Sequence, residues 1–482
     1  MRIRINTITS LLLSLTISAA TFSETGLAHA GSHLTGESAK IVTIKMRDFK
    51  AGLRALIQGG YDVAGMNVTE GTVDVVIANS SLKEVVSLKV GSVVKARDID
   101  PGIAPDTQYT SFDELTAKIN DFAARYPSLV TVESIGKSHE NRDIWAVKIT
   151  SDVLPNERKP AIFFNAMHHA REVMTTEVAL DMIERLTLGY ESDEMVKHWV
   201  DSNQIWIVPM VNPDGNNKVW TSNNMWRKNV REGYGVDINR NYPYAWGTCN
   251  GSSGSTWSDT YRGPSAGSEP ETRAMMGLVS RIEPVLSISY HSYSELVIYP
   301  YGCDGAHTPE RQVVESVGQT LASKMPKDGS SGTYDPGTSW ELLYAVDGGD
   351  IDWYYHEHHV LPYVIEVNSS NQGFQPAYSW RKPTVEKLRA AWGYMLDRAE
   401  QSGIRGVVKG LNSAGAAGTV TITPMGRNGE NLEPRIYNIK KDGTFHVVVE
   451  PGMYNVTVDS GGRTASLDLT VGARRSDLEL AL

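Results

Sequence analysis

Long apolar runs, cysteine and positive charge are all scarce in this chain of 482 residues. After the N-terminal segment no stretch approaches the ~20 apolar residues of a membrane-spanning helix, which argues against a membrane protein. The two cysteines lie too far apart in the sequence to form a metal knuckle. A formal net charge of −10 argues against nucleic acid as the main partner, because proteins bind that polyanion with basic surfaces.

The N-terminal end has the pattern of a targeting segment. Arg2 and Arg4 are followed by an apolar stretch from Leu11 to Ala20 and by the A-x-A sequence Ala28-His29-Ala30. This pattern predicts that residues 1–30 are a signal peptide and that the protein is secreted, to the periplasm or the extracellular space.

Export bears on the two cysteines, Cys249 and Cys303. Both would lie in an oxidising compartment, which permits one disulfide bond between them. The sequence does not give the distance between them, so a bridge and two free thiols are equally open at this point.

A chain of this length should hold about three domains, and its pattern changes twice. Residues 31–105 predict a ferredoxin-like domain, with signals in the order strand, helix, strand, strand, helix, strand. The strand signals are Ile41–Ile44, Tyr61–Met66, Thr72–Ile77 and Ser92–Ala96, and the helix signals are Phe49–Ile57 and Leu82–Leu88. A polar linker from Arg97 to Gln108, which contains Pro101 and Pro105, predicts an exposed segment that a protease could cut.

Residues 106–402 predict an α/β body with a mixed central sheet flanked by helices. A capping pattern from Ser111 to Glu114 begins one helix, and Val173–Leu186 predicts another with one apolar face. Short apolar runs predict buried strands at Ala161–Asn165, Gln204–Pro209, Val285–Tyr290 and Tyr363–Val367. Residues 403–482 contain alternating strand-like runs divided by turn residues, which predicts a β-sandwich.

The strongest local motif lies between a predicted strand and the helix after it. Residues 165–172 read N-A-M-H-H-A-R-E, and open α/β sheets collect ligands in the crevice beyond the carboxyl ends of their strands. His169 and Glu172 could offer an imidazole nitrogen and a carboxylate to one cation, a mixture that suits Zn²⁺. The H-x-x-E spacing alone is weak, because such pairs occur by chance. We expect the neighbouring His168 to pack or to support the site.

A third ligand has to come from elsewhere in the chain. His291 ends another predicted buried strand, and a lone histidine in that place is more often structural than a ligand. If the two strands are neighbours, however, His291 reaches the same sheet edge as His169 and Glu172. That makes His291 the best candidate for the third ligand.

Together with later segments, these motifs resemble the zinc carboxypeptidase family typified by pancreatic carboxypeptidases A and B. The resemblance covers most of residues 109–402, and its motifs follow in the family's order. The N-terminal domain resembles the family's inhibitory activation domain, and residues 403–482 resemble the transthyretin-like modules of some members. The resemblance implies an enzyme with one Zn²⁺ that hydrolyses the C-terminal peptide bond of peptides and proteins.

The resemblance also implies a role for individual residues. It makes His169, Glu172 and His291 the metal ligands, Arg227 the residue that polarises the scissile carbonyl, and Glu366 the catalytic carboxylate. The implied substrate-binding residues are Asn239 and Arg240 for the terminal carboxylate, Arg171, the mobile Tyr344, Tyr293 and Ile351.

Physical chemistry gives independent reasons for three of these roles. The guanidinium of Arg240 is always charged, and its planar fork matches a carboxylate. A permanent charge also suits Arg227 to a developing oxyanion. Glu366, at the end of an apolar strand, would be partly desolvated and able to carry a proton at neutral pH. We expect it to take a proton from water and to return it to the leaving amine.

The preferred terminal side chain is only partly readable. In the family, the second residue after the Gly-Gly pair helps to set the preference, and Ile351 at this position implies apolar or aromatic residues. Asp347 and Asp350 flank it, and would admit Lys or Arg if either pointed inward, but both could equally face solvent. We expect a hydrophobic preference and leave tolerance of basic residues open.

The N-terminal domain implies a zymogen, in which this domain blocks the cleft until an activating protease cuts the linker. The alternative is a domain that assists folding and is never strongly inhibitory. We expect a monomer that acts on peptides with free C-termini. Two rival functions are a metal-dependent amidase on the same scaffold and a binding protein that has lost catalysis. The second rival should lack a metal ligand or the catalytic carboxylate, and this sequence has all four residues.

Overall fold

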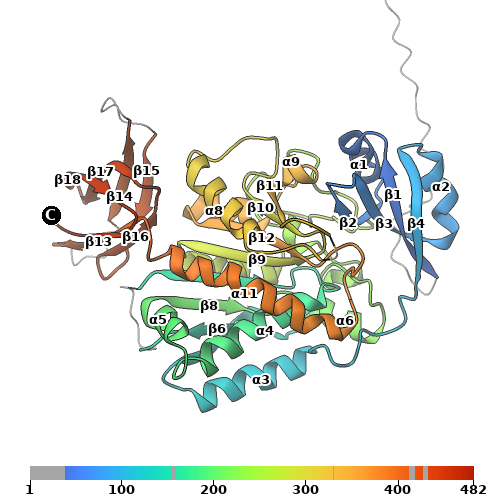
Figure 1. Ribbon diagram of the computed structural model, residues 1–482, viewed down its shortest axis with the longest axis horizontal. Coiled ribbons are helices and arrows are strands. Elements are labelled where there is room, and N and C mark those ends of the chain that lie inside the picture. The colour runs from blue at the N-terminus through green and yellow to red at the C-terminus, as the bar shows by residue number, and fades with distance from the viewer. Residues whose placement is uncertain (1–37, 153–158, 329, 412–417, 427–432) are drawn as a thin grey trace, which may run out of the picture.

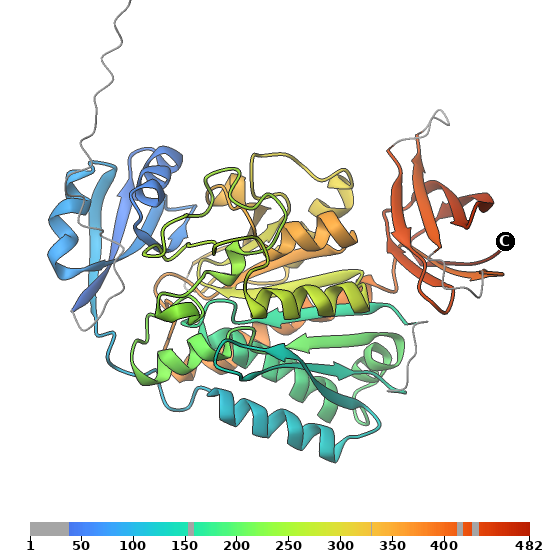
Figure 2. The ribbon, with the colours of Figure 1, turned by 180° about the vertical axis from the view of Figure 1, so that it is seen from behind.

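The computed structural model describes residues 38–152, 159–328, 330–411, 418–426 and 433–482. The predicted signal peptide lies outside the described residues. A central body separates an N-terminal and a C-terminal domain, which lie at its opposite ends (Figure 1 and Figure 2). Among the described residues, no helix has both the length and the apolar composition needed to cross a bilayer.

The N-terminal domain is a four-stranded antiparallel sheet covered by helices. Its elements are β1 (Ala39–Met46), α1 (Phe49–Gln58), β2 (Asp62–Asn67), β3 (Thr72–Ala78), α2 (Leu82–Ser87) and β4 (Gly91–Ile99). Apolar side chains of the sheet, such as Val42 and Val75, form one core with Leu53 and Leu56 of α1. The elements follow the order that the sequence predicts, and the strands lie in the order β2-β3-β1-β4.

The linker after this domain is shorter than the sequence predicts. β4 continues to Ile99, and Arg97, the first residue of the predicted linker, pairs with Ile41 across the sheet. Pro101 is buried, whereas Ile103 is 63% exposed. The prediction ended the strand too early because charged residues in an edge strand resemble a polar linker. The accessible parts of the linker are therefore residues 102–104 and 106–108.

The body is built on an eight-stranded mixed sheet, which confirms the predicted α/β architecture. In the order β11-β10-β12-β9-β7-β8-β6-β5, its strands are β11 (Asp335–Thr338), β10 (Leu296–Tyr299), β12 (Leu361–Val367), β9 (Leu286–Ser292), β7 (Ala161–Ala166), β8 (Gln204–Val208), β6 (Asp143–Ile149) and β5 (Val130–Lys137). The central strands β12, β9, β7 and β8 run parallel, so their carboxyl ends meet at one edge of the sheet. The sequence predicts these four buried strands and misses the shorter or more polar outer ones.

Helices cover the sheet on both faces. They are α3 (Phe112–Arg125), α4 (Val173–Leu188), α5 (Glu194–Ser202), α6 (Pro213–Thr221), α7 (Pro270–Ile282), α8 (Arg311–Ser323), α9 (Ser339–Leu342), α10 (Asp350–His358) and α11 (Arg381–Arg398). The capping box predicted before α3 is present, with Ser111 and Glu114 bonded to each other's backbone N–H groups.

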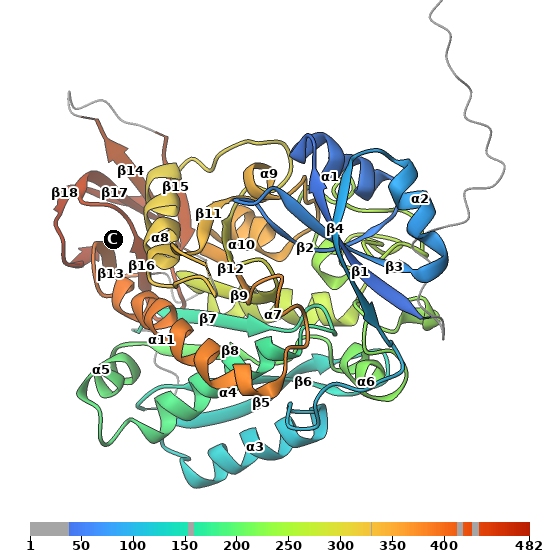
Figure 3. The same cartoon turned by 45° about the vertical axis from the view of Figure 1, so that its right-hand side comes forward.

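The predicted apolar face of α4 packs into the core, and α4 is buried along nearly its whole length. α11 packs beside it and covers the side that carries its polar residues (Figure 3). The polar residues on that side pair with α11 and its start: Glu177 Oε2 lies 2.7 Å from Arg381 Nε, and Asp181 Oδ1 lies 2.6 Å from Arg389 Nη2. Buried ion pairs of this kind leave no periodic signal in the sequence.

The C-terminal domain consists of two sheets around one apolar core. Its strands are β13 (Gly403–Lys409), β14 (Thr419–Met425), β15 (Arg435–Asn438), β16 (Thr444–Val448), β17 (Gly452–Ser460), β18 (Arg463–Val471) and β19 (Ser476–Ala481). The domain is tied to the body by polar contacts. Arg398 of α11 donates to the Val449 carbonyl at 3.0 Å, and Arg435 pairs with Glu310 at 2.5 Å.

Two buried acids hold the loop that contains Asn229 and Arg231. Glu269 and Glu271, at the start of α7, both accept from the Asn229 side-chain amide, at 2.8 and 3.0 Å. His139 Nε2 lies 2.7 Å from Glu269, and Arg231 pairs with the same carboxylate at 3.1 Å. Burial is the main reason why the pKa of Glu271 is raised to about 7; the Asn229 amide and His139 lower it, and the negative Glu269 adds to the rise. Glu271 is therefore largely protonated in the folded protein below neutral pH.

This arrangement predicts a pH-dependent stability. Because the pKa of Glu271 is higher in the folded than in the unfolded chain, the free energy of unfolding decreases as pH rises from about 4.5 to 7. Glutamine stays neutral at every pH, so Glu271→Gln should stabilise the protein by about 2 kcal/mol at pH 8 and hardly at all at pH 5. Thermal unfolding at both pH values measures this, with the exposed Glu191→Gln as control. Equal stabilisation at both pH values would contradict the protonation of Glu271.

Candidate active site and metal centre

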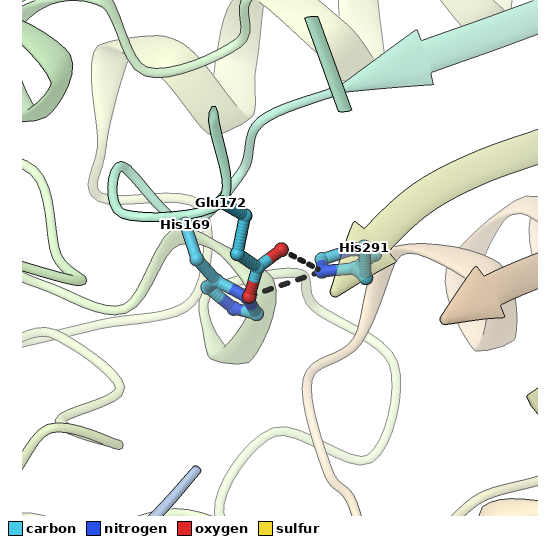
Figure 4. Close-up of side chains that lie close together, drawn as sticks. All are labelled: His169, Glu172 and His291. Atoms are coloured by element: carbon cyan, nitrogen blue, oxygen red, sulfur yellow. Dashed lines mark hydrogen bonds and ion pairs between the residues drawn. The ribbon is translucent and has the colours of Figure 1, made fainter. Parts of the chain in front are cut away.

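The three predicted metal ligands lie together at the carboxyl edge of the sheet (Figure 4). His169 and Glu172 occupy the turn between β7 and α4, and His291 lies near the end of β9. β7 and β9 are parallel neighbours, which brings residues 122 positions apart into contact. The condition that the sequence leaves open, adjacency of the two strands, is therefore met.

Their polar atoms converge on one point. His169 Nδ1 lies 2.7 Å from Glu172 Oε1, and His291 Nδ1 lies 3.1 Å from Glu172 Oε2. The two Nδ1 atoms are 3.1 Å apart, and all three residues are buried. Two imidazole lone pairs this close repel each other unless a proton or a cation lies between them.

The far sides of both rings have polar neighbours. His169 Nε2 lies 3.3 Å from Asp237 Oδ1, and His291 Nε2 lies 3.3 Å from Asn239 Nδ2 and from Ser289 Oγ. A carboxylate behind a histidine holds the ring so that its other nitrogen faces the metal. Two imidazoles and one carboxylate with room for further ligands form a donor set typical of catalytic Zn²⁺. These residues therefore fit the ion that the sequence predicts.

Glu366 lies beside this centre, on β12. β12 is the parallel neighbour of β9, and Glu366 is directly opposite His291 in the register. Burial raises the pKa of Glu366 to about 7; His291 and Arg227 lower it, and Glu172 raises it. A carboxyl with a pKa near neutrality can both accept and donate a proton at physiological pH.

Asp237, which has no role among the residues predicted from the sequence, links the metal centre to Arg227. Its Oδ2 accepts from Arg227 Nε at 3.1 Å and Nη2 at 2.9 Å, while its Oδ1 faces His169. A signal was available, since Asp237 stands two residues before Asn239, to which the resemblance gives a role in substrate binding. His168 is placed as expected: it packs on His291 with ring centroids 5.5 Å apart and bonds Tyr242 Oη at 3.1 Å.

The predicted carboxylate clamp faces the same cavity as the metal ligands. Arg240 Nη2 lies 3.3 Å from Tyr344 Oη, and Arg240 Nε donates to the Gly251 carbonyl at 3.1 Å. Asn239 accepts from the Asp350 N–H at 2.8 Å. The structure therefore brings the clamp, the predicted lid tyrosine and the metal ligands into one site.

One part of the cavity is apolar. Ile298, Ile351 and Val364 line it and pack together as one cluster. Asp347 is absent from the lining and accepts from backbone N–H groups elsewhere. Asp350 does line the cavity, and its Oδ2 lies 3.9 Å from His168 Nε2. Neither acid is at the surface, so the expectation that they could face solvent is wrong.

The N-terminal domain enters the cavity, with β2 residues among its lining. Asp62 pairs with Arg171, Nη2 to Oδ1 at 2.7 Å, and Tyr293 donates to Asp74 at 2.8 Å. The Met66 N–H donates to Ser294 Oγ at 3.0 Å. Two predicted substrate-binding residues, Arg171 and Tyr293, are thus bonded to this domain. The sequence carried no signal for Asp62 or Asp74, which belong to no motif.

The two cysteines are bonded to each other, with Cα atoms 5.7 Å apart. The bond joins a loop that follows Arg240 to the chain just after β10. Of the two alternatives left open by the sequence, the bridge is correct.

Comparisons with known proteins agree with this geometry. A family model described as zinc carboxypeptidase matches residues 115–391, more than half of the chain. A zinc carboxypeptidase of Saccharothrix mutabilis subsp. capreolus is 34% identical over 56% of this chain, and carboxypeptidase A2 of Mus musculus is 33% identical over 58%. The chain spans 64% and 67% of the lengths of these two relatives. The crystal structure of carboxypeptidase A from Helicoverpa armigera superposes with a TM-score of 0.64 at 23% identity, over 75% of this chain and 96% of that one.

Proposed function

Because the chain belongs to the zinc carboxypeptidase family, we propose that it is a zinc metallocarboxypeptidase that removes C-terminal residues from peptides and proteins. The observation that carries this proposal is the common cavity of His169, Glu172, His291, Glu366 and a buried arginine-asparagine clamp. A free terminal carboxylate would meet Asn239 and Arg240 there. Its peptide bond would then lie near the metal ligands and Glu366.

A zinc ion held by His169, Glu172 and His291 would supply Lewis acidity, which polarises the scissile carbonyl and acidifies water. Glu366 accepts the proton of the attacking water and returns it to the leaving amine. Arg227, fixed by Asp237, donates to the carbonyl oxygen as negative charge grows on it.

The clamp and the lid decide where the chain is cut. Arg240 and Asn239 bind the terminal carboxylate, so only the last peptide bond reaches Glu366. Tyr344, already in contact with Arg240, covers the bound residue and limits access of water. C-terminal residues are therefore released from the peptide one at a time.

We further propose that hydrophobic and aromatic terminal residues are preferred. The walls formed by Ile298, Ile351 and Val364 support this preference. Asp350 and Asp352 also line the cavity. Burial raises the pKa of Asp352 to about 7. Its Oδ atoms accept from the Gly302 N–H, which leaves it a weak partner for a lysine or arginine side chain. Basic residues would be accepted more slowly than Phe or Leu.

We also propose that the protein is secreted, as a zymogen. The charged and apolar pattern of residues 1–30 and the Cys249–Cys303 bridge support export. The bonds of Asp62 and Asp74 to Arg171 and Tyr293 support inhibition, since they use groups that a substrate would need.

The decisive experiment measures release of the terminal residue from N-blocked dipeptides ending in Phe, Leu, Lys, Arg or Glu. The chain should first be cut at the exposed Ile103 with a serine protease that cleaves after branched aliphatic residues. We expect release that stops when a chelator removes zinc and returns when zinc is added, with Phe and Leu fastest. C-terminally amidated dipeptides are the matched control, and should be hydrolysed at least about 100-fold more slowly.

Two outcomes would contradict the proposal. Equal hydrolysis of the amidated and the free dipeptides would favour an amidase on the same scaffold. Zinc binding without turnover of either would favour a binding protein.

A further inference from the structure

Three chain segments meet behind Arg240, and none of them binds the predicted metal. They are residues 249–251, residues 302–303 and residues 345–347. The Cys249–Cys303 disulfide joins the first two segments, and the Val346 N–H donates to the Gly302 carbonyl at 2.9 Å. The third connection is made by the carboxylate of Asp347, so each segment is bonded to both of the others.

Asp347 is completely buried. In the described part of the chain its hydrogen bonds come from backbone N–H groups, and one cysteine sulfur lies close to it. Its Oδ2 accepts from the Gly251 N–H at 3.0 Å and the Cys249 N–H at 3.2 Å, and lies 3.6 Å from Cys249 Sγ. Its Oδ1 has no hydrogen-bond partner among the described residues. Burying a carboxylate without a counter-charge costs free energy. Neutral groups would hold this loop in place at a lower cost.

The contact between the two loops is backbone against backbone. A Cβ atom on Gly251 would lie 2.5 Å from the Ala345 carbonyl oxygen and 2.6 Å from the Asp347 nitrogen. Only glycine fits at this position, and the loops cannot shift apart without breaking the bonds to Asp347. The position of Gly251 is therefore determined by Asp347.

Gly251 in turn supports the guanidinium of Arg240. Its carbonyl oxygen accepts from Arg240 Nε at 3.1 Å, while Nη1 donates to the Asn239 carbonyl at 2.8 Å and Nη2 contacts Tyr344 Oη. These contacts fix the plane of the guanidinium that would receive the terminal carboxylate. Tyr344 belongs to the same loop as Asp347, three residues earlier.

We propose that Asp347, held by the Cys249–Cys303 disulfide, is a positioning residue that sets the orientation of Arg240 for the terminal carboxylate. This inference rests on the proposed function, because it deepens the role of the same clamp. Asp347 acts through Gly251, and it couples the loop that carries the lid tyrosine to the clamp. Its buried charge stiffens both backbone N–H contacts, since charge-assisted hydrogen bonds are about twice as strong as neutral ones.

The test compares Asp347→Ala and Asp347→Asn in the chain cut near Ile103. Alanine removes the acceptor, so we expect KM for N-blocked Gly-Phe to rise about tenfold with kcat changed less than about threefold. Asparagine keeps an acceptor of the same shape and should restore most of the affinity. The Cys249→Ser, Cys303→Ser double variant should raise KM in the same direction. Asp304→Ala, an exposed acid next to the same disulfide, is the matched control and should leave KM unchanged.

A double-mutant cycle with Arg240→Ala separates positioning from general support of the loop. If Asp347 acts through Arg240, Asp347→Ala should add little further loss of kcat/KM when Arg240 is already missing. A full additional loss in the Arg240→Ala background would overturn the inference, as would an unchanged KM in Asp347→Ala. Unfolding temperature and zinc content identify a variant that fails to fold, and in that case the Cys249→Ser, Cys303→Ser double variant decides by the same two criteria.

The two proposals fail differently. If the unaltered protein does not hydrolyse N-blocked Gly-Phe, the proposed function is wrong, and calorimetric binding of the same dipeptide as acid and as amide still tests Asp347. If the unaltered protein is active and Asp347→Ala is equally active, only the inference about Asp347 is wrong.

Discussion

Replacing Glu366 by glutamine should lower kcat by about 10³-fold while leaving zinc binding and KM nearly unchanged. Glutamine has the same shape but cannot take a proton from water or return it to the amine. Glu366 lies opposite His291 on the neighbouring strand, so the substitution keeps the packing of β12. The loss should therefore be confined to the chemical step.

Kinetics with N-blocked Gly-Phe and metal analysis of the same preparation measure both parts of this prediction. Glu357→Gln, at an exposed position on α10, is the control and should keep full activity. A Glu366→Gln protein with more than about a tenth of the original kcat would show that another group carries the proton. Loss of zinc from this variant would show instead that Glu366 supports the metal centre.

The sequence predicts most of this site because its residues sit in segments with strong local patterns. His169 and Glu172 follow a short apolar strand, and Glu366 ends another. Parallel strands place their carboxyl ends at one edge, so strand-end residues from distant segments meet once the strands are neighbours. The pairing of β7 with β9 is a tertiary fact, however, and the sequence could state it only as a condition.

What the sequence could not predict depends on contacts between domains or on burial. Asp62 looks like any acid at the start of a surface strand until β2 is placed against Arg171. Asp347 looks like an exposed loop acid, yet it is buried because two glycine-containing loops pack around it. Hydrophobic patterns report which apolar residues are inside, and they are silent about a polar residue that is buried with its partners.

The edges of the elements show the same limit. The polar pattern around Arg97 predicts a linker, although β4 continues through it as an edge strand whose pairing partner is β1. The sequence marks the apolar face of α4 but gives no sign that α11 buries its polar side as well. In both places tertiary pairing adds what a local pattern does not contain.

Cutting the chain near Ile103 should raise kcat/KM by at least about 100-fold. In the uncut chain the N-terminal domain is bonded to Arg171 and Tyr293, which the substrate would otherwise contact. Asp62→Asn should release part of this inhibition without any cut. Removing one partner of a buried ion pair costs about 2–5 kcal/mol, so docking of the domain should weaken at least tenfold. Glu70→Ala, which changes an exposed acid of the same domain, should leave the uncut chain as inactive as before.

Hydrolysis rates of N-blocked Gly-Phe before and after the cut decide between an inhibitory and a folding role of this domain. The Arg171–Asp62 pair is buried against Phe374, whose ring lies 4.1 Å from the Arg171 guanidinium. If Asp62 is replaced and the domain stays docked, the Arg171 guanidinium is therefore left desolvated and without its ion-pair partner. An uncut chain as active as the cut one would mean that the domain leaves the cleft readily, and its contacts would then serve folding. If the unaltered chain is active only after the cut, while the Asp62→Asn chain is already partly active before it, this ion pair holds the enzyme inactive.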